Sequence, residues 1–303
     1  MRPTLATHCT DTSTLRARQV LAGAFAAALA EPASTLGRRK HGDLGDVLSQ
    51  AWRDACDACE QATSHADVGG AEGADRSIQA LGIGEMAPAG ADVAPLARWL
   101  AFDPATRHRA HQAVFGLVIS KQCPAYETEY SHTRDATYRA HQMADIAGFF
   151  AAFGVAVADD DAERCDHVAL ELEFVAFLLT KLEHAQDEAG ADRDEHRAIC
   201  RDALHDFVRH HVAWWMPTFA RCLEKRVDQI RQMGHDALVA DAARALAGVG
   251  RVLRAWVCVE RTMAGVEPNQ QVVAPQVDIE PDAMTCATCA LSGALTSAVP
   301  ATP

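Results

Sequence analysis

The chain has 303 residues, and 28 lysines and arginines stand against 41 aspartates and glutamates, a formal net charge of −13. Nucleic-acid binding needs a basic surface, so this charge argues against a DNA- or RNA-binding protein. With 49% apolar and 23% charged residues, the composition is that of a globular protein with a large core and excludes global disorder. Alanine and leucine dominate and β-branched runs are nearly absent, so we expect an all-α protein.

The number and spacing of cysteines and the N-terminal sequence indicate the cellular compartment of the protein. Ten cysteines are spread over the whole chain. A core of this size is stable without disulfide bonds, so we expect the cysteines to be reduced, as in the cytoplasm. The stretch 20–30 has the composition of a secretory signal, but Asp11 lies where such a signal is basic, and Leu21 and Phe25 share one helical face. No apolar stretch approaches the roughly 18 residues of a membrane span. We therefore expect a cytoplasmic protein.

Apolar residues recur at spacings of three and four along most of the chain, which predicts a series of amphipathic helices. The aspartates 159–161 are expected to cap the longest helix, and Pro217 either kinks a helix or starts a new one. The result is a bundle of about eight to nine helices. In chain order the expected helices are 14–30, 43–62, 93–102, 105–120, 133–153, 162–189, 194–215, 217–232 and 236–262.

Two segments lack this periodicity. Residues 63–95 are rich in Gly, Ala, Asp and Pro, so we expect a long inserted loop that is the preferred site of proteolysis. Residues 265–303 contain Pro, Thr, Ser and Ala without a repeat and predict a disordered tail. With a flexible leader over 1–12, one helical domain is predicted over 13–264.

The longest predicted helix carries His167 and Glu171 at i, i+4, beside its apolar stripe. A carboxylate among apolar neighbours must be paired or protonated, because burying it alone is costly. Two interpretations stay open. The pair forms a structural hydrogen bond that joins helices, or it belongs to a polar spot that lines a groove.

Fourteen histidines invite an alternative hypothesis, a metal-binding helical protein. A di-metal carboxylate bundle needs two Glu-x-x-His steps and two further inward glutamates. The sequence has one such step, Glu129-x-x-His132, beside a proline break, and Asp202-x-x-His205 is the nearest substitute. The histidine and carboxylate pattern therefore supports this alternative weakly.

Two Cys-x-x-Cys pairs, Cys56/Cys59 and Cys286/Cys289, could form a four-thiolate zinc site. The first pair lies within a predicted helix and the second in the predicted tail, so packed or free thiols are the simpler interpretation. The sequence has no phosphate-binding loop, no Gly-x-Ser-x-Gly and no dinucleotide fingerprint. We expect a protein that is not an enzyme and holds no cofactor or metal.

Four blocks follow one another from Cys123 onward: CPAYETEY (123–130), MADIAGFFAAFG (143–154), DHVALELEF (166–174), and a spaced set made of Phe207, His211, Trp215, Pro217 and Phe219. They resemble the CPxYExxY, LADxxGFYxAFG, DHxxxELxF and FxxxHxxxWxPxF segments of the TorD family of redox-enzyme maturation chaperones, which includes DmsD-like and NarJ-like proteins. The blocks cover about one third of the chain. Each is weak alone, but four in the right order are fairly specific.

The sequence departs from the family pattern in places. Cys165 stands where Pro is common, Phe150 where Tyr is usual, and Ala151 where a basic residue often lies. The sequences YETEY and MADIAGFF are similar to the corresponding segments of chaperones that serve dimethyl-sulfide-, ethylbenzene- or chlorate-type molybdoenzymes. The family pattern explains neither the 63–95 insertion nor the cysteine-bearing tail.

The resemblance implies a TorD-like helical bundle without catalytic activity. Such a chaperone binds the twin-arginine signal peptide of a molybdoenzyme's catalytic subunit and holds the subunit until cofactor insertion is complete, before export. The expected partners are this peptide and the apo catalytic subunit, without nucleic acid or stable membrane insertion. Both a monomer and a homodimer are open, because the long loop permits an exchange of helices.

A twin-arginine peptide is a basic pair followed by an apolar, helix-prone run, so its receptor should be an apolar groove with acidic edges. We expect three carboxylates to meet the arginines: Asp145, Asp166 and Glu171. We expect His167 to orient that acidic cluster. The expected groove residues are Phe149, Phe150, Phe153, Phe174 and Trp215, and the expected peptide-binding set is completed by Tyr126, Glu127, Tyr130 and His211.

Overall fold

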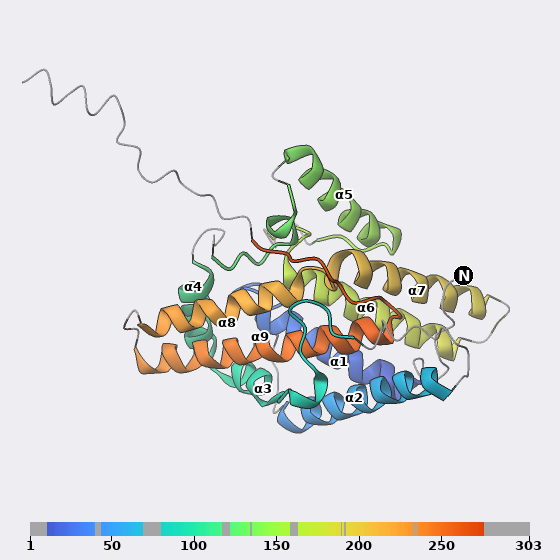
Figure 1. The fold of residues 1–303 in the computed structure, drawn as a ribbon, viewed down its shortest axis with the longest axis horizontal. Helices are drawn as coiled ribbons and strands as arrows, with labels where there is room; N and C mark the ends of the chain where they lie inside the picture. The colour runs from blue at the N-terminus through green and yellow to red at the C-terminus, as the bar shows by residue number, and fades with distance from the viewer. Residues whose placement is uncertain are drawn as a thin grey trace, which may run out of the picture.

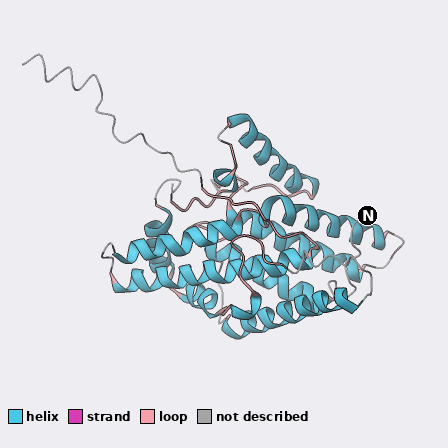
Figure 2. Cartoon of the chain, viewed as in Figure 1, coloured by secondary structure: helices cyan, strands magenta, loops and turns pink. Residues whose placement is uncertain are grey.

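The computed structural model describes residues 11–39, 44–68, 80–116, 122–133, 135–157, 163–188, 190, 192–232, 234 and 236–275. Within these ranges the chain is largely helical and has no β-strand, which confirms the all-α prediction (Figure 2). The α-helices are α1 (Thr12–Leu29), α2 (Gly45–Val68), α3 (Ala94–Ala101), α4 (Pro104–Phe115), α5 (Ala136–Ala152), α6 (Val168–Asp187), α7 (Arg193–Phe207), α8 (Met216–Gln232) and α9 (Ala237–Met263).

Three short turns accompany these helices: the 3₁₀ turns η2 (Pro88–Gly90) and η3 (Glu127–Tyr130), and the π-helical turn η4 (Val208–Val212). The turn η4 follows α7 directly, and α8 begins a few residues later. Pro217 lies in the first turn of α8, where its missing N–H is not needed, so it starts a new helix and does not kink an existing one.

Helices α1 and α9 form the centre of the bundle. Helix α1 packs against α6 and α2, while α9 packs against α8, α3 and α4 (Figure 1). Phe25 of α1 and Trp256 of α9 have no exposed surface, and their ring centroids are 5.6 Å apart. A helix that is apolar on nearly all sides is typical of a core position, and the second half of α9 is buried almost completely.

Two buried ion pairs join distant parts of the chain to α9. Arg18 of α1 donates to both carboxylate oxygens of Glu260, at 3.0 and 2.5 Å. Arg261 donates to both oxygens of Glu85, at 2.8 and 3.1 Å, and neither side chain is exposed. Because each charge has a bidentate partner, burial does not leave an uncompensated ion in the core.

The structure corrects several predicted boundaries. Helix α2 continues six residues beyond the predicted end, to Val68, so the expected 63–95 loop starts later. Residues 69–79 lie outside the described residues, but the rest of the loop packs against the bundle: Ile83 N donates to Asn269 O at 2.8 Å. The expected caps at 159–161 also lie outside the described residues, and α6 begins at Val168 with His167 as its N-cap.

The two ends of the chain are described in part. Residues 1–10 of the expected leader and 276–303 of the expected tail lie outside the described residues. Residues 265–275 make more contacts than their composition predicts: Val266 is buried and Asn269 is half-buried. No helix in the described part of the chain is long and apolar enough to cross a membrane.

Helix α5 stands off the bundle, above α6 and α7 in the view of Figure 1. Asp135 caps its N-terminus by accepting hydrogen bonds from the backbone N–H groups of Thr137 and Tyr138. Only Ile146 and Phe150 of its 17 residues are buried. The helix is therefore attached along one narrow face, and the site described next lies beneath that face.

Candidate functional site

The first and third sequence blocks are held together by backbone hydrogen bonds. Glu127 N donates to Asp166 O at 2.9 Å, and Val168 N donates to Ala125 O at 2.9 Å. An isolated antiparallel bridge pairs Tyr126 with His167 between them. The turn η3 and the start of α6 thus form one rigid unit, although nearly 40 residues separate them in sequence.

Asp166 is fully buried and already paired. Its two oxygens accept hydrogen bonds from Arg164 Nε at 3.0 Å and Nη2 at 2.7 Å. The Thr128 hydroxyl adds a third, at 2.7 Å. Because its partners come from within the chain, Asp166 is not free to meet an arginine of a ligand in this conformation, which differs from the expectation.

His167 has a local structural role. Its Nδ1 accepts the backbone N–H of Ala169 at 3.2 Å and so caps α6. Burial lowers the pKa of the imidazole to about 4, so the ring is neutral at pH 7. The expected side-chain link to Glu171 is replaced by a backbone hydrogen bond, from Glu171 N to His167 O at 3.1 Å. His167 therefore orients the start of α6 and not the acidic cluster.

Glu171 has no exposed surface, and its Oε2 accepts a hydrogen bond from Trp215 Nε1 at 3.1 Å. Burial, and then the neighbouring Glu127, raise the pKa of this carboxyl group well above its ordinary value of 4.5. Its Oε1 has no hydrogen-bond partner within the described part of the chain. Burial therefore favours the neutral acid over the carboxylate at this position.

Glu127 is the centre of the polar network. Its side chain is fully buried, and Oε1 accepts hydrogen bonds from Gln142 Nε2 at 2.6 Å and Trp214 Nε1 at 3.0 Å. His211 Nδ1 lies 3.1 Å from its Oε2. Among the described residues, no lysine or arginine pairs with this carboxylate. A histidine, a glutamine and an indole are its neighbours in place of a permanent cation.

His211 connects this buried carboxylate to the surface. Its side chain is 2% exposed, and its Nε2 lies 3.3 Å from Asp145 Oδ2. That contact lacks the geometry of a hydrogen bond, so Nε2 is a buried nitrogen without a hydrogen-bond partner within the described ranges. The Asp145 side chain is 65% exposed. A row of Glu171, Glu127, His211 and Asp145 therefore leads from the core to solvent.

These residues border a cavity of about 910 Å³ between η3, α5, η4 and the segment 271–274. We call it the Glu127 cavity. Four predicted site residues line it: Glu127, Tyr130, Asp145 and His211. Sequence reasoning missed other lining residues, among them Tyr138, Gln142, Arg209, Trp214 and Gln271–Ala274. Arg209 is exposed and makes no ion pair with the described residues.

The predicted phenylalanines come together, but they pack on one another. Phe174 of α6 lies 4.7 Å from Phe150, 6.0 Å from Phe153 and 4.8 Å from Phe207 between ring centroids. Phe149 lies edge-on to Phe207 and His211. This aromatic cluster attaches α5 to α6 and α7. Trp215, also expected in the groove, is fully buried.

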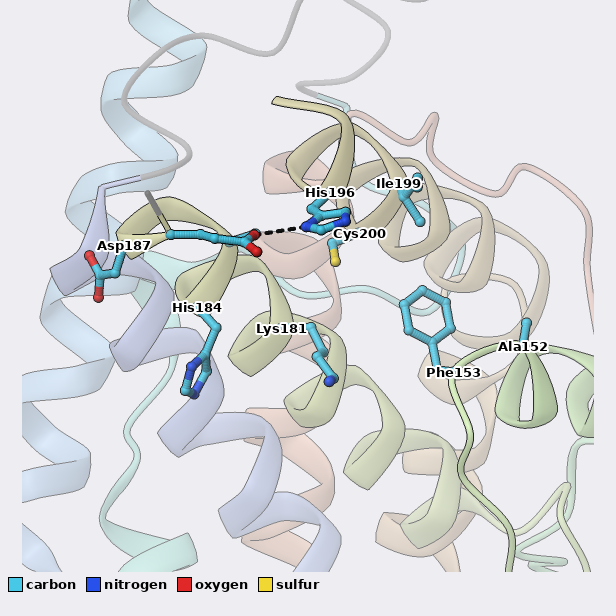
Figure 3. Close-up of a pocket in the computed structure, with 10 residues that line it drawn as sticks. Ala152, Phe153, Lys181, His184, Asp187, His196, Ile199 and Cys200 are labelled. Atoms are coloured by element: carbon cyan, nitrogen blue, oxygen red, sulfur yellow. Dashed lines mark hydrogen bonds and ion pairs between the residues drawn. The ribbon is translucent and has the colours of Figure 1, made fainter. Parts of the chain in front are cut away.

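A second cavity, of about 670 Å³, lies where the end of α5 meets α6 and α7 (Figure 3). Phe153 borders it opposite Ile199 and Cys200. Its histidine His196 pairs with Glu188 at 2.8 Å, which raises the pKa of that imidazole. No buried, unpaired polar atom of a described residue borders this cavity. The Glu127 cavity is therefore the stronger candidate for a binding site.

The residues proposed for a metal site have other contacts. Glu129 lies 3.3 Å from Arg139 and 3.8 Å from Arg164, and the ring of His132 stacks edge-on against Tyr138. Cys286 and Cys289 lie outside the described residues. Across the described ranges, no three His, Cys, Asp or Glu side chains are grouped as a metal ion would require. The metal-binding alternative is not favoured.

Comparison with known proteins gives partial matches. A family model described as nitrate reductase delta subunit matches residues 84–221. The chain is 35% identical over 92 residues to a selenate reductase assembly chaperone protein of Thauera selenatis and 33% identical over 92 residues to a chlorate reductase assembly chaperone protein of Ideonella dechloratans; each match covers 30% of this chain and 45% of the relative.

A third relative is the chaperone protein TorD of Vibrio cholerae, which is 35% identical over 89 residues, or 28% of this chain and 35% of the relative. The matched region thus spans less than half the length of each of these relatives. No solved structure matches the chain. The family-model match contains both η3 and η4, which carry Glu127 and His211.

Proposed function

We propose that the chain is a member of the TorD family of redox-enzyme maturation chaperones, which its partial matches support, and that it is a non-catalytic assembly chaperone for a molybdenum-containing oxidoreductase. We propose further that it acts in the cytoplasm. There it binds the twin-arginine signal peptide of the catalytic subunit and holds that subunit until cofactor insertion is complete. Two of the relatives are named as chaperones of selenate and chlorate reductases, which supports a reductase of this kind as the client.

The observation that carries the peptide-binding proposal is that Glu127 and Asp145 have no lysine or arginine partner among the described residues, although Arg209 also lines the cavity. Glu127 and Asp145 are two carboxylates on either side of one imidazole, that of His211. A buried carboxylate is stable only when it is paired, and a cation that enters the cavity supplies the pair. The cavity is therefore suited to a positively charged side chain.

Asp166 shows how a buried carboxylate is paired with a cation elsewhere in this protein. Asp166 receives Nε and Nη2 of Arg164, the two-pronged contact that a guanidinium makes with a carboxylate. Glu127 has no such partner within the described residues. The exposed Asp145 would meet an incoming arginine first, and the aromatic faces of Tyr138 and Trp214 beside it are suited to a planar cation.

The test is binding of a synthetic peptide with an Arg-Arg pair followed by an apolar alanine and leucine run, measured by fluorescence anisotropy. We expect Asp145→Asn to weaken binding about fivefold, because an exposed charge contact contributes about 1 kcal/mol. The matched control is Asp57→Asn, at an exposed position of α2, which should leave the affinity unchanged.

Two outcomes would count against parts of the proposal. A peptide with Gln-Gln in place of Arg-Arg that binds equally well would refute the arginine site. The chaperone role is tested separately by capture of the tagged protein from its own cells, followed by mass spectrometry. Recovery of a molybdoenzyme subunit that retains its signal peptide would support it, and recovery of no such subunit would contradict it.

A further inference from the structure

The segment that follows α9 crosses the bundle towards η3 and α5 (Figure 1). Its first part is held firmly. Val266 N donates to Arg261 O at 2.9 Å, and Val266 O accepts from Arg261 Nη1 at 3.0 Å. Asn269 O accepts the N–H of Ile83 at 2.8 Å, and Asn269 Nδ2 donates to Trp214 O at 3.1 Å. The segment is therefore anchored as far as Asn269.

The next residues are held differently. Gln271, Val272, Val273 and Ala274 line the Glu127 cavity in a non-helical stretch, and Gln271 is hydrogen-bonded to Asn269. No hydrogen bond joins Val272, Val273 or Ala274 to the described part of the chain. Val272 is 83% exposed, and Val273 alone of these three is partly buried against the core. A firm anchor is thus followed by a short stretch that a few apolar contacts hold in place.

The chemistry of this stretch matches the proposed ligand. Its small apolar residues Val272, Val273 and Ala274 line the same cavity as Tyr130, Trp214 and Asp145. A twin-arginine peptide has its small apolar run next to its arginine pair. If an arginine of the peptide reaches Asp145 in this cavity, the residues that follow it pass along the walls of the same cavity, to which Val272 and Val273 contribute.

We infer that this wall of the Glu127 cavity is a binding site for an extended segment of small apolar residues, that the chain's own residues 271–274 occupy it, and that a peptide ligand displaces them. The displacement rests on the proposed function, whereas the occupancy in cis does not. The apparent affinity for a peptide is then reduced by the fraction of molecules in which residues 271–274 fill the site. Because the hold is weak, the anchored segment can return when the peptide leaves.

The first test removes the apolar contacts and keeps the anchor. A double variant, Val272→Gly with Val273→Gly, should bind the labelled Arg-Arg peptide about fivefold more tightly, since little more than one half-buried valine holds the stretch. The matched control is Gln270→Gly, an exposed position in the same segment that does not line the cavity. Equal or weaker binding by the double variant would overturn the inference and make the stretch a fixed part of the site.

The second test does not depend on arginine recognition. A labelled peptide with the sequence of residues 268–275 should bind the double variant in trans and bind the unaltered protein at least fivefold less well. Failure of this peptide to bind the double variant would overturn the apolar site. A further outcome separates the two proposals. If the Arg-Arg peptide binds neither the unaltered protein nor the double variant, while the 268–275 peptide binds the double variant, the proposed function is refuted. The inference that residues 271–274 occupy this site is then still supported.

Discussion

The protonated carboxyl group of Glu171 leads to a prediction about stability and pH. Burial raises the pKa of this group well above 4.5 in the folded protein, whereas the unfolded chain has the ordinary value. Above pH 4.5 the folded state therefore retains a proton that the unfolded state releases. Stability from this group is fully present below pH 4.5 and is lost as pH rises towards the folded pKa.

The size of the effect follows from linkage. Each pH unit between the unfolded and folded pKa lowers the free energy of unfolding by about 1.4 kcal/mol for one retained proton. Glutamine has nearly the same shape, cannot ionise, and can still accept from Trp215 and donate to Glu127.

We therefore expect Glu171→Gln to gain stability relative to the unaltered protein as pH rises. Urea unfolding followed by tryptophan fluorescence at pH 5.5, 6.5 and 7.5 measures the difference between the two proteins. That difference should shift in favour of the variant as pH rises, by at most about 1.4 kcal/mol per pH unit, the slope for one retained proton. Lost contacts change its size but not its slope. A difference independent of pH would refute the protonated state of Glu171.

Three further predictions concern the elements around the Glu127 cavity. Phe174→Ala removes the ring on which Phe150 packs and should lower the free energy of unfolding by about 3 to 5 kcal/mol in urea titration; a loss below about 1 kcal/mol would show that α5 is held by other contacts. Arg164→Ala leaves Asp166 buried without its cation and should cost about 3 kcal/mol, while Asp166→Asn in that background should restore part of the loss. His167 has a folded pKa of about 4 and an unfolded pKa of 6.5, so its contribution to stability falls as pH drops below 6.5. His167→Asn keeps a side chain that can cap α6 but cannot be protonated in this range. Thermal unfolding should therefore show a smaller drop in Tm for the variant than for the unaltered protein between pH 6 and 4.5.

Much of the fold follows from local sequence rules. The spacing of apolar residues predicts the α-helices to within a few residues at most of their ends, because a helix that packs on a core must repeat every 3.6 residues. Pro217 starts α8 for a similarly local reason, since it cannot donate an N–H inside a helix. The four ordered blocks are also local patterns, and the family assignment that they predicted is supported by the comparisons.

The direction of individual side chains is not local information. The π-helical turn η4 adds residues to one turn, so helical periodicity no longer tells which face holds His211. Trp214 and Trp215 are adjacent, yet the first borders the Glu127 cavity and the second is buried beside Glu171. The sequence alone assigns Trp215 to the site, whereas Trp214 is the indole that lines this cavity.

The acidic residues also show the difference between what local sequence determines and what tertiary packing determines. Sequence determined that carboxylates and histidines occur at regular positions on amphipathic helices in an all-α protein. Only tertiary packing decided that Arg164 neutralises Asp166, that Glu171 keeps a proton, and that Glu127 has no permanent cation within the described residues. A charge and its partner can be far apart in sequence, and burial, which sets the cost of an unpaired charge, exists only once the helices have assembled.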